Sequence, residues 1–267
     1  MRYLRSCALR SGSSGNAILL ASEQSALLVD AGITGKGLAC ALQDLAEDPA
    51  KLKGILLTHE HWDHISGLGV LLRRYRIPLY INRETLRACL PDLGKVDPDL
   101  IRVVYDHEKI RIDDFEIKPF PISHDAADPV GYTAETDLGT IGICTDLGYT
   151  DEYVYQALAG ADICYLEANY DPDMLKVGSY PQYLKERIAG HQGHLSNDDC
   201  GRACIRLLEQ GTERIILSHL SQENNFPHLA LLTVNDALAA VGAKEGLDYQ
   251  LTAARRFDIS VPQGLTG

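Results

Sequence analysis

The stretch THEHWDHISG, Thr58–Gly67, follows the apolar run GILLT and carries four side chains that can bind metal within six residues. These side chains are His59, His61, Asp63 and His64. The first two alternate along an extended segment, so both point to the same side, and the other two come from the turn into a helix. Imidazole and carboxylate groups suit Zn²⁺, Mn²⁺ or Fe²⁺, and so many of them together favour two adjacent ions.

A purely structural cluster of these side chains is the alternative interpretation. Such a cluster would leave several polar groups to be satisfied in the protein interior, which folded proteins avoid. The spacing HxHxDH therefore predicts a site for two divalent metal ions. Zinc is the first choice, and manganese and iron are the other candidates.

The motif resembles that of the metallo-β-lactamase-fold hydrolases, and the resemblance covers nearly the whole chain. It implies an α/β fold, a four-layer αββα sandwich in which two mixed β-sheets are flanked by helices. In that family the metals lie at one edge of the sandwich, held by loops from both halves. We expect residues 1–267 to form one such domain.

The resemblance also implies the remaining metal ligands, each at the end of an apolar strand. His124, in FPISHD, matches the third histidine of the first metal, and Asp146, in GICTDLG, matches the bridging carboxylate. His219, in IILSHLS, matches the last ligand of the second metal. Asp30, in LLVDAG, resembles the buried aspartate that orients a ligand histidine. Taken singly, each of these could also be a structural histidine, a turn or a cap residue.

Composition narrows the class of protein. The chain has 267 residues, 45% hydrophobic and 23% charged, which is ordinary for a well-packed fold. No run reaches the roughly 18 apolar residues of a membrane span, and Arg5 and Arg10 interrupt the first segment. Seven scattered cysteines without a CxxC pair agree with a cytoplasmic location. The net charge of −12 argues against a broad basic surface that grips phosphates.

Strand-like and helix-like segments alternate along the whole chain without a linker between the halves. We expect strands near residues 3–9, 17–21, 26–32, 54–58, 78–82, several within 101–122, and 130–136, 140–146, 162–169 and 214–219. We expect helices from the histidine motif to about residue 75 and near 84–90, 152–158, 197–210 and 233–241. Cys200 and Cys204 lie one helical turn apart and fit an apolar helix face better than a metal pair. His107 and His228 are expected at the surface.

The segment SGSSGN, Ser11–Asn16, lies between two expected strands and forms a hairpin turn, since glycine and asparagine tolerate positive φ. It resembles the first loop of phosphodiesterase members such as tRNase Z. Small residues allow backbone N–H groups to approach an anion, which gives this turn a possible phosphate-binding role. The residues of that candidate phosphate loop are Ser13, Ser14, Gly15 and Asn16.

Two further segments resemble tRNase Z, namely DICYLEANYD and GHLSN. The resemblance implies that His194 lies beside the scissile phosphate and that Glu167 orients it; a strand-end salt bridge is the alternative for Glu167. A histidine that donates a proton to the departing oxygen is an acid catalyst, and we expect catalytic parts for Asp63, His194 and Glu167. Ser196 is expected to cap the next helix with Asp199, whereas His191 is expected to be a bystander.

The motifs SGSSGN, THEHWDHISGL, SHDAADPVGY and GHLSN together look closest to the YycJ/WalJ (VicX) branch of the family. That resemblance implies a phosphodiesterase or nuclease, 5′-to-3′ DNA exonuclease-like, with a metal-held hydroxide as the nucleophile and DNA ends as substrate. From the composition we expect no membrane association, and we infer no obligate protein partner.

Two other functions remain open. The same fold can cleave a carboxylic ester, thioester or lactone, with Tyr132, Tyr149 or Tyr170 polarising the carbonyl. The chain could also be a metal-bound regulatory or scaffold protein, although a complete ligand set argues against lost catalysis.

Overall fold

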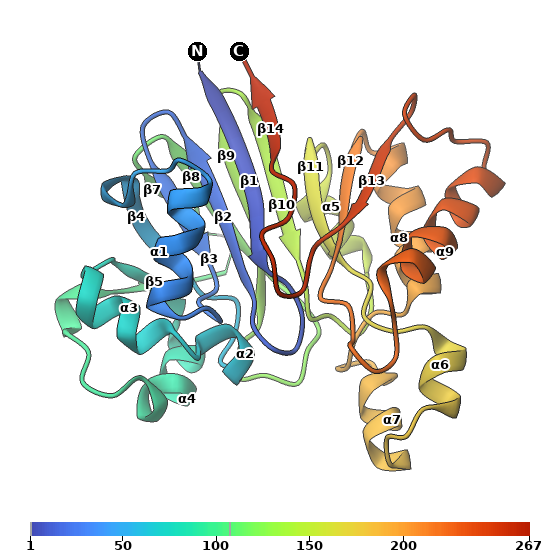
Figure 1. Ribbon diagram of the computed structural model, residues 1–267, viewed down its shortest axis with the longest axis horizontal. Helices are drawn as coiled ribbons and strands as arrows, with labels where there is room; N and C mark the ends of the chain where they lie inside the picture. Colours follow the sequence, from blue (N-terminus) through green and yellow to red (C-terminus); the bar gives the residue numbers. More distant parts are fainter. Residues whose placement is uncertain (1, 107) are drawn as a thin grey trace.

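The computed structural model describes residues 2–106 and 108–267 as two packed β-sheets covered by helices on their outer faces (Figure 1). In spatial order, the first sheet contains β14 (Gln263–Thr266), β1 (Tyr3–Arg10), β2 (Ala17–Ser22), β3 (Ala26–Val29), β4 (Leu52–Leu56), β5 (Leu79–Asn82) and β6 (Ile101–Val104). The second contains β13 (Gln250–Ala253), β12 (Arg214–Ser218), β11 (Ile163–Glu167), β10 (Gly139–Cys144), β9 (Val130–Thr136), β8 (Phe115–Pro121) and β7 (Ile110–Ile112).

Most of the helices divide between the two outer faces, which gives the four layers. The first half of the chain supplies α1 (Gly35–Asp44), α2 (Trp62–Ile65), α3 (Leu68–Tyr75) and α4 (Arg83–Leu93). The second half supplies α5 (Glu152–Leu158), α8 (Asn197–Glu209) and α9 (Pro227–Ala240) to its outer face, while α6 (Pro172–Val177) and α7 (Gln182–Ile188) lie below the sheets (Figure 1). The expected αββα sandwich of two mixed sheets is confirmed.

Three apolar clusters hold the layers together. Along β3, Leu27 and Val29 pack in the cluster between the sheets, whereas Leu28 packs under the helices of the first half. Successive strand residues point to opposite faces, and both faces of this strand are covered, so it is apolar throughout. Cys200 and Cys204 of α8 lie in the third cluster, fully buried, as expected for core residues.

Parallel pairing sets where the functional loops lie. β3, β4 and β5 run parallel in the first sheet, and β10, β11, β12 and β13 run parallel in the second. Parallel neighbours end at the same edge of a sheet, so the loops that follow these strands gather at one edge of the sandwich. This edge is at the bottom of Figure 1.

The two ends of the described chain lie together at the opposite end of the sheets (Figure 1). β14 pairs antiparallel with β1, with Tyr3 opposite Thr266 and Ser6 opposite Gln263. The last strand therefore completes the sheet that the first strand begins.

The sequence expectations missed several elements and misplaced one boundary. α1, α6, α7, β13 and β14 were not expected, and α9 begins at Pro227 rather than near residue 233. α7 has no buried residue, so no apolar periodicity marks it. His228 is exposed as expected, while His107 lies outside the described residues. Within the described residues, no helix has both the length and the apolar character needed to cross a bilayer.

Candidate metal centre

Three histidines from two loops form the first cluster at the lower edge. His59, His61 and His124 place their ligand nitrogens within 4.8 Å of one another. His124 Nδ1 lies 3.0 Å from the Gly193 carbonyl oxygen, so this nitrogen carries the proton and Nε2 offers a lone pair toward the cluster. His124 Nε2 is 3.2 Å from His61 Nδ1. Imidazole nitrogens arranged in this way are suited to a shared cation.

A second cluster combines one carboxylate with two histidines: Asp63, His64 and His219. Asp63 Oδ2 lies 3.5 Å from His64 Nε2 and 3.4 Å from His219 Nε2. The Asp30 carboxylate lies 2.8 Å from His64 Nδ1, which keeps the proton on that nitrogen and turns Nε2 toward the cluster. The structure therefore brings Asp30 to the position expected of an orienting residue.

Asp146 lies between the two clusters. Its Oδ2 is 3.3 Å from His64 Nε2, and its Oδ1 is 3.2 Å from His219 Nδ1 and 4.0 Å from His124 Nε2. Both Asp146 Oδ2 and His59 Nε2 are buried and have no hydrogen-bond partner among the described residues. Buried polar atoms normally have a bonding partner. A carboxylate oxygen and an imidazole nitrogen without one are the ligand atoms that divalent cations would bind.

The backbone is strained where three of these residues leave their strands. Asp30, Asp146 and His219 have φ values of 62°, 60° and 53°. Left-handed conformations are costly for residues other than glycine and concentrate at functional sites. In this backbone conformation the three side chains turn back toward the edge of the sandwich.

The charges of the clusters also favour cations. Burial and the neighbouring His64 hold the pKa of His59 well below its usual range, which keeps it neutral. Burial would also lower the pKa of His219, but Asp146, Asp63 and Glu167 raise it to about 10. The carboxylates thus favour positive charge on the neighbouring histidine. Bound divalent cations would supply that positive charge instead of protons.

His194 and Glu167 meet beside the clusters. Glu167 Oε1 lies 2.8 Å from His194 Nδ1 and 2.8 Å from His219 Nδ1, while its Oε2 accepts hydrogen bonds from the Leu147 and Leu195 N–H groups. Burial opposes the charged form of His194, but Glu167 reverses this and raises the pKa of the imidazole. Glu167 is fully buried, whereas the His194 side chain is 22% exposed, so His194 can reach a ligand.

The hairpin loop between β1 and β2 lies next to the second cluster. Ser13 and Ser14 are exposed, whereas Asn16 is buried: its Nδ2 is 2.9 Å from His64 Nε2 and 3.0 Å from Asp63 Oδ2. Gly15, with φ of 156°, packs so closely on Gly32 that an added Cβ would lie 2.1 Å from its carbonyl oxygen. The loop therefore presents two serines outward and turns Asn16 toward the clusters.

Sequence reasoning missed two supporting residues. The Thr58 hydroxyl lies 2.9 Å from Asp30 Oδ1 and 3.0 Å from His59 Nδ1, linking the two histidine clusters. Asp125 Oδ1 lies 3.5 Å from His124 Nε2, and Arg187 of α7 pairs with the other oxygen. Each adjoins a motif histidine in sequence, which is the signal that could have identified it.

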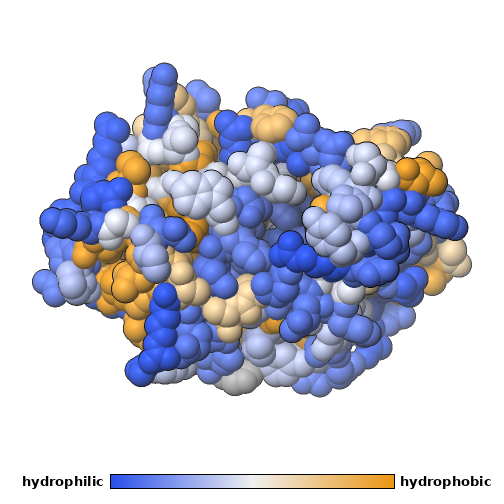
Figure 2. Space-filling view, turned by 90° about the horizontal axis from the view of Figure 1, so that it is seen from below, coloured by the Kyte–Doolittle hydropathy of each residue, from blue (hydrophilic) through white to orange (hydrophobic). Residues whose placement is uncertain are grey.

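Ser196 caps α8 as expected, accepting a hydrogen bond from the Asp199 N–H, and its hydroxyl bonds the Asp199 carboxylate. His194 thus lies two residues before a helix N-terminus, whose partial positive charge favours anions. Seen from below, this edge of the molecule is mostly hydrophilic around a hollow near its middle (Figure 2).

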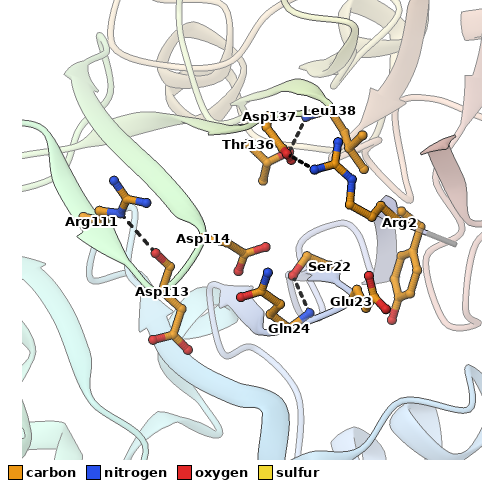
Figure 3. A pocket seen from close by; sticks show the side chains of 11 residues that line it. Arg2, Ser22, Glu23, Gln24, Arg111, Asp113, Asp114, Thr136, Asp137 and Leu138 are labelled. Atoms are coloured by element: carbon orange, nitrogen blue, oxygen red, sulfur yellow. Dashed lines mark hydrogen bonds and ion pairs between the residues drawn. The ribbon is translucent and has the colours of Figure 1, made fainter. Parts of the chain in front are cut away.

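A polar cavity of about 510 Å³ lies at the opposite end of the sheets (Figure 3). It is bounded by the β2–β3, β7–β8 and β9–β10 turns, and Arg2 pairs with Asp137 across one side. None of the ligand groupings found among the described residues includes a residue of this cavity. The candidate ligand groupings of the described residues therefore lie at the lower edge.

The sequence matches the family profile described as the metallo-beta-lactamase superfamily over residues 10–219. The chain belongs to this superfamily. The resemblance inferred from the histidine motif is therefore confirmed. Superfamily membership and the histidine and aspartate clusters support a dinuclear site for divalent metals.

Similar proteins of the metallo-beta-lactamase superfamily cover almost the whole chain. The exodeoxyribonuclease WalJ of Streptococcus pneumoniae is 40% identical over 245 residues, 91% of each chain. The exodeoxyribonuclease YycJ of Bacillus anthracis is 35% identical over 243 residues, 91% of this chain and 92% of that protein. The structure of the short form of human tRNase Z aligns with a TM-score of 0.64 at 17% identity, covering 96% and 98% of the two chains, and shares the fold.

Proposed function

We propose that the chain is a dinuclear metal-dependent phosphodiesterase that acts on DNA ends as a 5′-to-3′ exonuclease. The observation that carries this proposal is the pair of His194 and Glu167, 2.8 Å apart, beside the Asp146 carboxylate. A buried glutamate that favours the charged form of an imidazole supports a proton donor for a departing oxygen. The similar exodeoxyribonucleases support DNA as the substrate.

We assign the ligands of the two metals by their grouping. His59, His61 and His124 would hold the first metal, and Asp63, His64 and His219 would hold the second, with the Asp146 carboxylate close to both groups. Asp146 also groups with Glu167, His194 and His219, but we assign Glu167 and His194 to proton transfer. Zinc is the proposed metal because histidines dominate the donor set, with manganese or iron as alternatives. When bound, such a pair of cations activates water near neutral pH and stabilises charge on a phosphoryl group.

The side chains around the metals would transfer protons and orient the ligands. Glu167 fixes the His194 proton on Nδ1, and the other nitrogen, Nε2, delivers a proton to the leaving oxygen. Asp63 is the partly exposed carboxylate of the site, with 21% of its side chain accessible, and it can accept a proton from the attacking water. Asp30 acts indirectly by holding His64.

We further propose that the β1–β2 loop contacts the phosphate backbone of the strand. Ser13 and Ser14 offer exposed hydroxyl and N–H groups, and Gly15 allows the close backbone turn. Asn16 orients the loop against His64 and Asp63.

The ester-hydrolase alternative is weaker for a geometric reason. The Tyr132 hydroxyl is fully buried and donates to the Leu57 carbonyl oxygen at 2.7 Å, so it cannot polarise a substrate. Tyr170 is also buried, at 7% exposure. Tyr149 is exposed and remains open to a ligand.

A direct test uses the full chain reconstituted with Zn²⁺ or Mn²⁺. We expect metal-dependent shortening of end-labelled DNA duplexes from the 5′ end and turnover of bis(p-nitrophenyl) phosphate. Metal analysis should find two ions per chain. A fully loaded protein that cleaves neither phosphodiester but cleaves a thioester or lactone would overturn the proposal.

The proposal includes one domain over residues 1–267, a cytoplasmic location and no obligate protein partner. Cell fractionation and sedimentation of the purified chain test the last two points.

A further inference from the structure

A cavity of about 460 Å³ adjoins the first histidine cluster. His124 forms part of its wall, so the cavity opens beside a proposed metal ligand. Its other walls combine apolar and aromatic side chains with polar groups, among them Ser123, Asp151 and Gln192. The residues that matter most are Pro121, Pro129, Tyr149, Tyr153, Val154 and Gln192. A cavity of this size, with flat apolar surfaces and several polar groups, can hold a small ligand that has both characters.

The cavity wall is fixed by an interlocked pair of loops. The Ser123 hydroxyl donates to the His191 carbonyl oxygen at 2.7 Å, and the Gly148 N–H donates to the Ser123 carbonyl oxygen at 2.8 Å. Gly148 lies so close to the same loop that an added Cβ would be 2.1 Å from the His191 carbonyl oxygen. The loops after β8 and β10 and the loop before α8 are therefore clamped together, which fixes the side chains they carry.

The clamp presents two aromatic rings. Tyr149 and His191 lie with ring centroids 5.4 Å apart and planes at 80°, an edge-to-face pair. The Tyr149 side chain is nevertheless exposed, with 40% of the residue accessible. His191, expected to be a bystander, thus has a packing role beside the site rather than a place among the candidate ligands.

We propose that this cavity binds the base of the terminal nucleotide, the one released by cleavage, with Tyr149 as its stacking surface and His191 as the support of that ring. This inference rests on the proposed function, because it assumes a DNA end at the metal centre. An aromatic ring stacks on any base, which suits an exonuclease that must accept every sequence.

The chemistry of the walls favours a base over a simple acyl chain. A base needs a flat apolar surface and polar groups at its edge, and Gln192 offers both a donor and an acceptor there. The cavity adjoins His124, so a base within it would hang from a phosphate at the clusters. An acyl group from an ester is the competing occupant and becomes an outcome of the test.

The test compares two DNA strands that differ only at the end: one with an ordinary terminal nucleotide, the other with an abasic one. For the unsubstituted protein, we expect the abasic end to lower kcat/KM roughly tenfold, since one stacked base is lost. Tyr149→Ala should lower kcat/KM by a similar factor on the ordinary strand and by much less on the abasic strand. Tyr149→Phe, which keeps the ring, should restore the preference.

Tyr183→Ala is the matched control, because Tyr183 is an exposed tyrosine on α7 outside the cavity. It should leave the ratio of the two strands as it is in the unsubstituted protein. Equal losses on both strands for Tyr149→Ala would mean a general structural role, and no loss on either would mean no contact with the base. Either result overturns the inference.

A binding measurement separates this inference from the proposed function. The fluorescence of 2-aminopurine deoxynucleoside monophosphate should be quenched on binding to the unsubstituted protein, and Tyr149→Ala should weaken that binding roughly tenfold. If the nucleotide binds in this way but no phosphodiester is cleaved, the base site stands and the proposed function fails. If cleavage occurs without quenching, or Tyr149→Ala instead impairs only ester hydrolysis, the base site is wrong.

Discussion

His194 and Glu167 give the sharpest expectation at the scale of single residues. In the proposed mechanism His194 donates a proton without binding metal, so His194→Ala should retain both metals and lose roughly a hundredfold in kcat. Metal analysis alongside turnover of an oligonucleotide checks this. Because His194 Nδ1 lies 3.8 Å from Asp146, loss of a metal from the variant would instead make His194 a ligand.

The pH dependence of kcat/KM should reflect the interaction between His194 and Glu167. Glu167 raises the pKa of His194, and only the protonated imidazole can act as an acid, so kcat/KM should fall as pH rises through this raised pKa. Glu167→Gln removes the carboxylate that raises it, and the alkaline limb should move to lower pH. The profile is measured at saturating metal, with metal content checked at each pH. A limb that stays in place would assign it to another group.

Asp146 joins the two clusters, and its replacement should separate them. Asp146→Asn keeps the size of the side chain but removes the charge, so we expect fewer than two metals per chain and a large loss of turnover. Isothermal titration with Zn²⁺ measures the affected site. Asp137→Asn is the control, because Asp137 pairs with Arg2 at the opposite end of the sheets and belongs to none of the ligand groupings among the described residues.

The structure brings together several side chains that the sequence singled out, because metal ligands need particular side chains at particular spacings. The HxHxDH motif pointed to His59 and His64, and the family resemblance pointed to Asp146 and His219. Thr58 was missed because its only sequence signal is its place next to His59, and its contact with the distant Asp30 arises from the fold. The left-handed backbone conformation of Asp146 could not be predicted from the sequence either, because no residue in GICTDLG requires it.

At the scale of elements, the clamp between loops depends on Gly148. Gly148→Ala would place a Cβ 2.1 Å from the His191 carbonyl oxygen, so the loop before α8 must move. We expect a loss of about 1–3 kcal/mol in the free energy of unfolding and a weaker turnover, because His194 follows in the same loop. Chemical denaturation and oligonucleotide cleavage check both effects.

Gly160→Ala is the control for that substitution. Gly160 follows α5, has a φ of 73°, and an added Cβ meets nothing within 4 Å among the described residues. It should lower stability slightly through backbone strain and leave turnover intact. A Gly148→Ala protein that behaves like this control would show that the clamp is unimportant.

Elements with a continuous apolar pattern were predicted well, and those without one were not. GILLT and RIILSH read as buried strands because both of their faces are covered. α7 buries no residue and β14 is half exposed, so neither carries periodicity. The start of α9 was placed too late, since Phe226 is extended and Pro227 begins the helix without a side-chain cap.

For the whole molecule, β14 tests the proposal of one domain. Without residues 262–267, β1 becomes an edge strand and Leu265 no longer packs against the cluster between the sheets. We expect the deletion to lower Tm while unfolding stays a single calorimetric transition. Two separate transitions in the full chain would contradict a single cooperative domain.

The neighbouring chain ends, far from the metal clusters, have a practical consequence (Figure 1). A tether on either end would leave the edge with the candidate metal ligands facing away from a solid support, so that edge would stay accessible in an immobilised protein. The same adjacency means that a short peptide could join the ends and that new ends could be opened at a surface turn elsewhere. The ends can therefore be modified or joined without changing the residues of the candidate metal site.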